Sequence, residues 1–394
     1  MSRYMIISSD CHAGANGREY RPYVDPEYRE RFDDYLAIQE QRLRAMMQGR
    51  AADREKEKSQ AEREDATSSL WDMKRRLEYL EADGVVGEVI FPQPGGATAP
   101  PFYAIGHSHD PSDQELTAAG TRAYNRWLAD FVASSPHPER HAGVAQITQY
   151  HDIDAAVREI VWAKEAGLRG GVLIRSQPEG DLPDYNHPRY EPIWATCEEL
   201  DMPVHTHGGE SISSRTPESF ALPGAMSIFF TEITWYGHRP LWFLIWSGAL
   251  ERHPNLKLVF TEQFADWVPD VLFRMDGVAE GAVSKMTRNQ NLGLKPSEYW
   301  ARQCYVGSSL MTRRETDRRY DIGVDTILWG TDFPHAEGTY PRTARRLHEA
   351  FDGLPEDELR SMLGEKAAEV YHFDLSKLAP SAEKLGPEAD FFNA

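Results

Sequence analysis

An aspartate and a histidine stand two residues apart near the start of the chain, at Asp10 and His12. In an extended chain, side chains two residues apart point to the same side, so this pair faces one point while Cys11 turns away. A carboxylate oxygen and an imidazole nitrogen placed in this way form two arms of a site for Zn²⁺, Mn²⁺ or Fe²⁺. An aspartate that only caps a turn is the alternative interpretation.

Residues of the same types end three further apolar runs. His205 and His207 share a face of one run, with His207 nearer its end; Glu262 closes another; Asp332 and His335 follow a fourth. Each residue alone has a structural explanation, such as a salt-bridged glutamate or an aspartate that caps a helix. Four runs that all end in metal-binding residue types instead indicate one shared site.

Short apolar runs recur along the whole chain and predict buried strands, because they are rich in β-branched residues and bounded by polar stretches. Helical periodicity separates most of them. Alternating strands and helices predict parallel strands with right-handed crossovers, and eight such units close a (β/α)8 TIM barrel. The alternative, an open doubly wound sheet, is disfavoured because no glycine-rich phosphate-binding turn follows the first strands. The predicted strands are 4–8, 85–91, 142–147, 170–174, 203–207, 257–261, 304–307 and 326–330.

Catalytic residues of such barrels lie at the carboxyl ends of the strands, so the four runs above would meet at one face. The other strands end in neutral or singly basic residues, as a substrate-binding surface would. Arg175, Arg215 and Arg239 are candidate anchors for a substrate carboxylate or phosphate, with surface salt bridges as the alternative. The aromatic residues expected to line the pocket are Trp235, Tyr236 and Trp267.

The chain is longer than a minimal barrel, and the surplus lies in identifiable places. We predict one domain over 1–373, with helical insertions after the first and fifth strands at about 26–82 and 210–236. A tail at 374–394, rich in Ala, Pro and Lys, is expected to wrap the surface. An amphipathic helix should end the first insertion, because four apolar residues there follow 3-4-3 spacing. They are Leu70, Met73, Leu77 and Leu80.

The composition excludes several classes of protein. Among 394 residues, 43 Lys and Arg face 62 Asp and Glu, which gives a net charge of −19. That charge argues against broad binding to nucleic acid or to an anionic membrane surface. The three cysteines, Cys11, Cys197 and Cys304, are too few and too scattered for a disulfide framework. With neither a membrane-length apolar run nor a signal peptide, a soluble cytoplasmic protein is expected.

The order of these motifs resembles the amidohydrolase superfamily, and more closely its amidohydrolase-2 branch. That branch includes aminocarboxymuconate semialdehyde decarboxylase, resorcylate decarboxylases and related hydrolases and hydratases. The resemblance extends from about residue 5 to about residue 373. It is carried by Asp-x-His at 10–12, by Asn-His-Pro-Arg-Tyr-Glu-Pro-Ile-Trp at 186–194, by the histidine at 207 and by Gly-Thr-Asp-Phe-Pro-His at 330–335.

The resemblance implies one divalent metal held by Asp10, His12, His207 and Asp332, with His205 as a second candidate on the fifth strand. The first ligand is Asp10, where many relatives have His or Glu. The branch also usually ends the sixth strand with an acid/base histidine, where this chain has Glu262. A glutamate beside a dication is held ionised and suits a base or a ligand better than an acid. Glu262 could therefore also bridge to a second ion, held partly by His205 or His335.

We therefore expect a metal-dependent hydrolase in which the metal lowers the pKa of a bound water. Glu262 or Asp332 would accept its proton, and His335 would carry a proton or support a ligand. The bond cleaved would be an amide, ester, thioester or the C–C bond of a β-dicarbonyl, in a small organic acid or acyl conjugate. The alternative is non-oxidative decarboxylation of an aromatic or muconate-like acid.

The expected cofactor is zinc, with iron or manganese as alternatives. One ion is expected and a second is left open. The expected partner is a small-molecule substrate, with no nucleic acid and no membrane, and a homodimer is expected because relatives form dimers. A barrel that binds metal without catalysis would need its open coordination position blocked.

Overall fold

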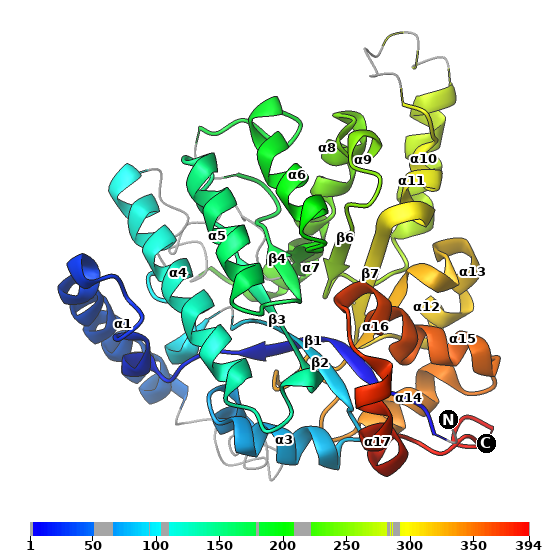
Figure 1. Ribbon diagram of the computed structural model, residues 1–394, viewed down its shortest axis with the longest axis horizontal. Helices are drawn as coiled ribbons and strands as arrows, with labels where there is room; N and C mark the ends of the chain where they lie inside the picture. The colour runs from blue at the N-terminus through cyan, green and yellow to red at the C-terminus, as the bar shows by residue number, and fades with distance from the viewer. Residues whose placement is uncertain are drawn as a thin grey trace.

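Eight parallel strands, paired in the order in which they follow one another in the chain, form the centre of the molecule (Figure 1). This computed structural model describes residues 3–50, 66–93, 95–103, 110–178, 181–208, 222–281, 284, 286 and 292–393. The strands are β1 (Ile7–Ala13), β2 (Gly87–Pro92), β3 (His141–Gln146), β4 (Gly171–Leu173), β5 (Val204–His207), β6 (Leu258–Thr261), β7 (Cys304–Ser309) and β8 (Ile327–Gly330).

The sheet closes where β1 meets the residues that follow β8. Cys11 pairs in parallel with Phe333. The backbone N–H of Asp332 donates to the carbonyl of Asp10 at 2.9 Å, and the N–H of His12 donates to the carbonyl of Phe333 at 2.7 Å. Closure of an eight-stranded parallel sheet confirms the predicted TIM barrel.

Helices surround the strands. Within the described ranges, every helix is too short or too polar to cross a lipid bilayer. The helices are α1 (Arg29–Arg50), α3 (Met73–Ala82), α4 (Pro111–Ala133), α5 (Ile153–Glu165), α6 (Glu191–Glu199), α7 (Ala225–Gly237), α8 (Arg239–Trp246), α9 (Ala249–Arg252), α10 (Val268–Glu280), α11 (Pro296–Gln303), α12 (Arg313–Asp317), α13 (Arg319–Ile322), α14 (Thr343–Phe351), α15 (Glu356–Arg360), α16 (Lys366–Tyr371) and α17 (Leu375–Leu385).

Helix α5 shows how the sequence sets an outer helix. The carboxylate of Asp152 accepts a hydrogen bond from the N–H of Ala155 at 2.9 Å and so caps the first turn. Ile160 and Ala163 lie on the buried face, as their spacing predicts. The helix ends before Gly167, whose φ of +86° suits glycine.

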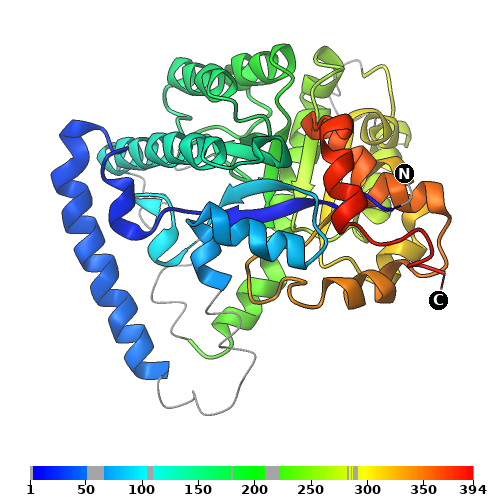
Figure 2. The same ribbon diagram turned by 60° about the horizontal axis from the view of Figure 1, so that its bottom comes forward.

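Two helices after β1 confirm a helical insertion there. Helix α1 projects from the barrel (Figure 2), and residues 51–65 of the predicted insertion lie outside the described residues. Helix α3 docks on the barrel through buried Leu77 and Leu80. Its Arg76 forms a fully buried ion pair with Glu88 of β2 at 2.6 Å. Of the predicted insertion after β5, at 210–236, residues 210–221 lie outside the described residues, and the remainder forms most of α7.

The amino end of the barrel is filled by apolar side chains from the strands and from the last helices. Met5, Ile7 and Val259 are among the buried residues that pack together with Val370 and Tyr371 of α16. Within the tail at 374–394, expected to wrap the surface, residues Leu375–Leu385 form helix α17. Helix α17 extends this core through buried side chains, which are Leu378 and Ala382.

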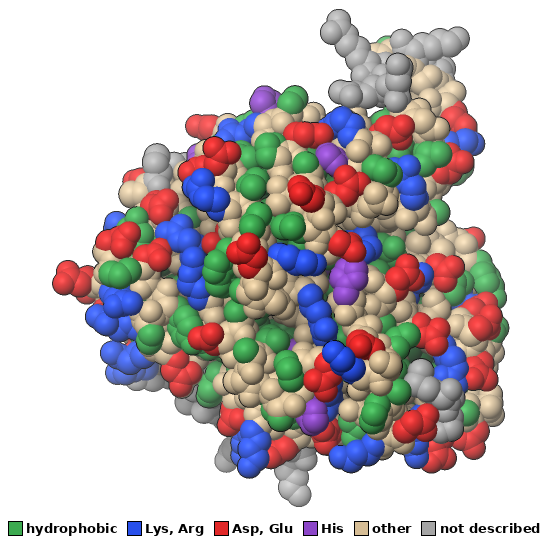
Figure 3. All heavy atoms as spheres, in the orientation of Figure 1, with side chains coloured by type: hydrophobic (Ala, Val, Ile, Leu, Met, Phe, Trp, Pro, Cys, Tyr) green, Lys and Arg blue, Asp and Glu red, His purple; other side chains and the backbone are tan. Residues whose placement is uncertain are grey.

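Acidic and basic side chains are interspersed over the face shown in Figure 3, with apolar side chains between them. The net charge of −19 is therefore not gathered in one patch on that face.

Candidate metal centre

Four side chains from β1, β5 and the end of β8 converge at the carboxyl end of the barrel. Nε2 of His207 lies 3.2 Å from Oδ1 of Asp10. Nε2 of His12 lies 3.5 Å from the same oxygen and 3.3 Å from Oδ1 of Asp332. All four side chains are buried. These are the four residues that the sequence resemblance implies as ligands, and the fold brings them together.

The polar atoms at this point suit a divalent cation. Nδ1 of His12 bonds to the carbonyl oxygen of Pro92 at 2.8 Å, so this nitrogen carries the proton and Nε2 presents its lone pair to the cluster. Within the part of the chain that the structure describes, Nε2 of His12 and both carboxylate oxygens of Asp332 lack an aligned hydrogen bond, although ring nitrogens of His12 and His335 lie 3.3 Å and 2.7 Å from Oδ1 of Asp332. Buried polar atoms without partners are costly unless a ligand satisfies them. Two carboxylates and two imidazoles form a donor set suited to Mn²⁺, Zn²⁺ or Fe²⁺.

Strand β1 is longer than predicted, and the additional residues include the two candidate ligands Asp10 and His12. The prediction ended it at residue 8, whereas the strand extends to Ala13, with an irregular register against β2 between Ser8 and Cys11. Asp10 and His12 therefore belong to the strand. Arg76 supports the turn that follows, because its Nη1 donates to the carbonyl of His12 at 2.8 Å.

Glu262 contacts the far side of the His207 ring. Oε2 of Glu262 lies 3.2 Å from Nδ1 of His207, whose Nε2 faces Asp10. A carboxylate in this position fixes the orientation of a metal-binding imidazole. Burial raises the pKa of Glu262 well above its ordinary value, and the charges of Asp332, Asp10 and Glu337 add to that increase. These groups favour the neutral carboxyl, whereas the expectation of an ionised Glu262 depends on the charge of a metal bound beside it.

The two carboxylates outside the strands lie on left-handed backbone. Both Glu262 and Asp332 have a φ of +55°. Such conformations are costly for residues other than glycine and concentrate at functional sites. Next to Glu262, a Cβ on Gly208 would come within 2.6 Å of the Glu262 carbonyl oxygen, so the close approach requires glycine here.

His335 joins the cluster from the loop after β8. Its Nδ1 lies 2.7 Å from Oδ1 of Asp332, and its ring stacks on that of His12 with centroids 4.0 Å apart. Its Nε2 lies 3.2 Å from the side-chain oxygen of Gln93. Burial lowers the pKa of His335, but Asp332, Glu337 and Asp10 outweigh burial and the pKa is raised. A histidine so placed can hold a proton beside the centre.

His205 does not join the cluster. Its Nε2 bonds to the carbonyl oxygen of Gly170 at 2.9 Å, and its Nδ1 contacts the hydroxyl of Thr261 at 3.3 Å. Burial lowers its pKa to about 3, so the ring is neutral. Because both nitrogens have protein partners, the ring has no lone pair for a metal, and we leave His205 out of the proposed ligand set.

Two residues that the sequence analysis did not propose also reach the site. The hydroxyl of Ser309, at the end of β7, donates to Oδ2 of Asp10. Glu337 groups with Glu262, Asp332 and His335, with one ligand atom of each lying within 4.8 Å of the others. Their positions in the sequence could have identified both residues. Ser309 follows a predicted strand, and Glu337 lies two residues after His335.

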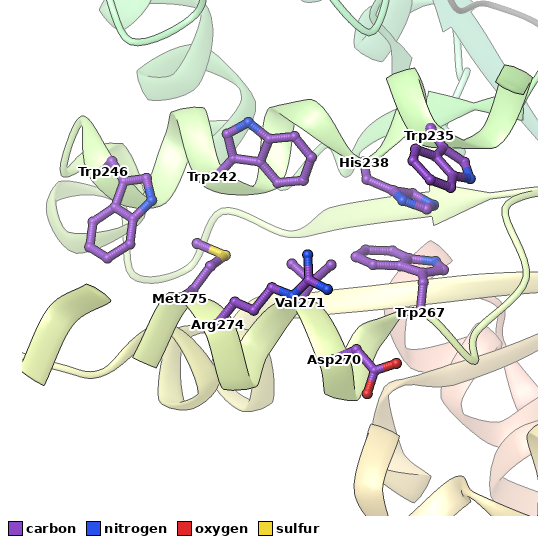
Figure 4. Close-up of a pocket in the computed structure, with 9 residues that line it drawn as sticks. All are labelled: Trp235, His238, Trp242, Trp246, Trp267, Asp270, Val271, Arg274 and Met275. Atoms are coloured by element: carbon purple, nitrogen blue, oxygen red, sulfur yellow. The ribbon is translucent and has the colours of Figure 1, made fainter. Parts of the chain in front are cut away.

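A cavity of about 390 Å³ opens beside the metal centre. Glu262, Ser309 and Glu337 join it to the cluster, and Phe264 and Leu310 supply apolar surface. Its size suits a substrate with a single ring. Trp235 and Trp267, expected to line this pocket, instead line a different cavity (Figure 4), and Tyr236 is half-buried on α7.

The three candidate arginine anchors differ in their positions. Arg239 hydrogen-bonds to Gln177 and lies 3.6 Å from Asp184, so its charge is shared with the loop after β4. Arg175 is buried at the end of β4 and stays a prediction. Arg215 lies outside the described residues.

Comparisons with known proteins identify relatives of this chain. A family model described as amidohydrolase matches residues 10–269. Gamma-resorcylate decarboxylase of Rhizobium sp. strain MTP-10005 is 26% identical over 268 residues, which cover 66% of this chain and 76% of that protein. The enzyme of the same name from Polaromonas sp. strain JS666 is 27% identical over 269 residues, with the same coverage.

Solved structures share the fold. The 5-carboxyvanillate decarboxylase of Sphingomonas paucimobilis has a TM-score of 0.67 and 21% identity, covering 94% of this chain and 100% of that one. A dihydroxybenzoic acid decarboxylase from Polaromonas sp. JS666, with bound manganese and the inhibitor 2-nitroresorcinol, has a TM-score of 0.62 and 19% identity, covering 97% and 99%. Because the family model matches more than half of its length, this chain belongs to the amidohydrolase-2 branch of the amidohydrolase superfamily.

Proposed function

We propose that this protein is a metal-dependent, non-oxidative decarboxylase of a small hydroxylated aromatic acid. This was the alternative in the sequence analysis, where hydrolysis came first. The observation that carries it is the cavity of about 390 Å³, sized for one ring, which Glu262, Ser309 and Glu337 join to the four candidate ligands. Burial and the neighbouring carboxylates raise the pKa of Glu262, which favours a carboxyl that holds a proton for the ring carbon. The names of the related decarboxylases support the same choice.

The reaction replaces the bond between a ring carbon and the carboxylate with a bond between that carbon and hydrogen. A proton is added to the carbon that bears the carboxylate, the bond between that carbon and the carboxylate breaks, and CO₂ leaves. The electron pair of the broken bond stays on the ring, so the products are CO₂ and the ring with hydrogen in place of the carboxylate. The residues of the site must therefore hold the ring, deliver one proton and recover it afterwards.

Asp10, His12, His207 and Asp332 would hold the metal, which when bound supplies positive charge to attract the substrate carboxylate and a neighbouring phenolic oxygen. Manganese is bound in the related decarboxylase from Polaromonas sp. JS666, which supports manganese for this chain where zinc was expected first. A bound dication lowers the pKa of nearby carboxyl groups, whereas burial and neighbouring carboxylates raise the pKa of Glu262.

The residues around the cavity have complementary roles in this proposal. Phe264 and Leu310 present apolar surface to the ring, and Gly208 leaves room beside Glu262. The Glu262 carboxyl donates its proton to the ring carbon. His335 then restores a proton to the site from solvent, because its raised pKa lets it carry one near neutral pH.

Product analysis tests the proposal. Purified protein loaded with Mn²⁺ is incubated with 2,6-dihydroxybenzoate and 5-carboxyvanillate in D₂O, and the products are followed by chromatography and mass spectrometry. We expect CO₂ and a decarboxylated phenol that carries one deuterium on its ring. Metal-free protein and Asp332→Asn are controls that should form no product. Hydrolysis of an ester, amide or β-diketone, with no CO₂ from either acid, would favour the hydrolase and contradict the proposal.

A further inference from the structure

A second cavity, of about 530 Å³, lies between α8 and α10 (Figure 4). None of the residues that line it lines the cavity beside the metal centre. The proposed reaction makes no use of it.

Flat aromatic rings form the walls of this second cavity. Trp242 and Trp246 lie one turn apart on α8, Trp235 comes from α7, and Trp267 directly precedes α10. Trp242 and Trp246 are half-buried, and Trp235 is 72% exposed. Several indole faces around one space suit a planar aromatic ligand, because rings stack on rings with good contact.

A buried polar atom also lines the cavity. His238 stacks on Trp267 with ring centroids 3.7 Å apart, and only 7% of the residue is exposed. Its Nε2 is buried and has no hydrogen-bond partner in the described part of the chain. Burial lowers the pKa of His238 to about 3, so the ring is neutral.

The lone pair of His238 is on this same Nε2. A hydrogen bond to the backbone of Gln263 opposes the effect of burial and raises the pKa of His238. A bond that raises a histidine pKa is one that the imidazole donates, here to the Gln263 carbonyl oxygen. Because Nε2 has no partner among the described residues, we assign Nδ1 as the donor and Nε2 as the acceptor.

One cation, Arg274, lies at the edge of the cavity and has no counter-charge among the described residues. Arg274 extends along α10 on the side of the cavity opposite Trp242 (Figure 4). No described residue forms an ion pair or hydrogen bond with it. The nearby acid, Asp270, has its own partner, Nη2 of Arg318, at 3.7 Å. The guanidinium is thus available to an anion from solution.

We infer that this cavity is a second binding site, for a planar aromatic anion that also carries a hydroxyl group. The rings stack among the tryptophans, the hydroxyl donates to Nε2 of His238, and the anionic group pairs with Arg274. Aromatic walls, a buried acceptor and an unpaired cation together specify this chemistry more closely than an apolar groove alone would.

A fluorescent probe tests both polar contacts. The probe is 6-hydroxy-2-naphthoate, added to metal-loaded protein while tryptophan fluorescence is recorded. We expect saturable quenching by one site in both the unaltered protein and Asp332→Asn, because the cavity beside the metal centre suits a single ring and the probe has two. The parent 2-naphthoate, without the hydroxyl, should bind about tenfold more weakly, which is the ordinary weight of one such hydrogen bond. In His238→Phe, which keeps a flat ring, the two probes should bind equally.

The carboxylate contact is tested in the same way. Arg274→Gln, a change at an exposed residue, should weaken the binding of 6-hydroxy-2-naphthoate about tenfold. The affinity for 2-naphthol, which has no carboxylate, should not change. Asp332→Asn should bind all three probes as the unaltered protein does, because the metal centre is a separate place.

Three results would overturn the inference. One is the absence of saturable binding. Another is loss of probe binding in Asp332→Asn while binding in Arg274→Gln is unchanged, which would place the probe at the metal centre. The third is a tryptophan spectrum that shifts with protein concentration and stops shifting in Trp235→Ser. That would show that a second copy of the chain fills the cavity.

Discussion

His205 and His207 show how the surroundings of a residue, more than its type, decide its role. They share one strand and one face. His205 has both nitrogens bonded within the barrel and a pKa lowered to about 3. His207 lies instead between two carboxylates, Asp10 and Glu262. The same side chain is thus structural at one position and a candidate ligand two residues later.

At the residue scale, Glu262→Gln separates the roles left open for this position. Glutamine keeps an oxygen that can accept the N–H of His207, but it has no proton to give. We expect kcat for decarboxylation to fall roughly 10²- to 10⁴-fold while metal content stays the same. Steady-state kinetics and elemental analysis measure the two quantities. Loss of a metal equivalent would instead identify Glu262 as a ligand, and an unchanged kcat would remove it from the reaction.

At the element scale, apolar patterning located all eight strands, because each must bury side chains on both faces of the sheet. The error at β1 has a physical reason. The prediction stopped where polar residues began, but Ser9, Asp10 and His12 are buried because they meet the site and the barrel seam. Apolar patterning also could not identify Ser309 and Glu337 as site residues. Their contacts with the cluster depend on how β7 and the loop after β8 are placed in space.

A hydrogen bond between the end of helix α3 and the start of helix α14 involves a carboxyl group that titrates. Thr343, the first residue of α14, donates its hydroxyl to Asp83, which follows α3. Burial raises the pKa of Asp83 to about 6, although the bonds from Thr343 lower it. The folded protein therefore retains a proton that the unfolded chain releases near its ordinary pKa of 3.8. Stability from this group is present below pH 4 and is lost as pH rises through about 6.

The variant Asp83→Asn tests that linkage. Asparagine keeps an acceptor for Thr343 and cannot ionise, so the variant should be more stable than the unaltered protein by about 3 kcal/mol at pH 8. Near pH 4 the two should unfold alike. Urea unfolding at both pH values measures this. The exposed Asp34→Asn is the matched control and should follow the unaltered protein, and a difference that is the same at both pH values would refute the assignment.

At the scale of the whole molecule, the candidate ligands join the first strand to the end of the last. A metal held there binds the closed barrel and not the unfolded chain. Removing it with a chelator should therefore lower the melting temperature, and restoring Mn²⁺ at 100 times its Kd should return about 2.7 kcal/mol. Differential scanning calorimetry follows the change. His207→Ala should lose the response to Mn²⁺, and a melting temperature indifferent to metal in the unaltered protein would contradict this account.

The seam between β1 and the residues after β8 also sets an order of events during synthesis. Asp10 and His12 leave the ribosome well before Asp332, which is translated 322 residues after Asp10. At about 5 to 20 residues per second, that delay is roughly 15 to 65 s. Throughout this time the nascent chain holds part of its ligand set and lacks the strand that completes it. A metal bound by all four candidate ligands can therefore be held only after translation has passed Asp332.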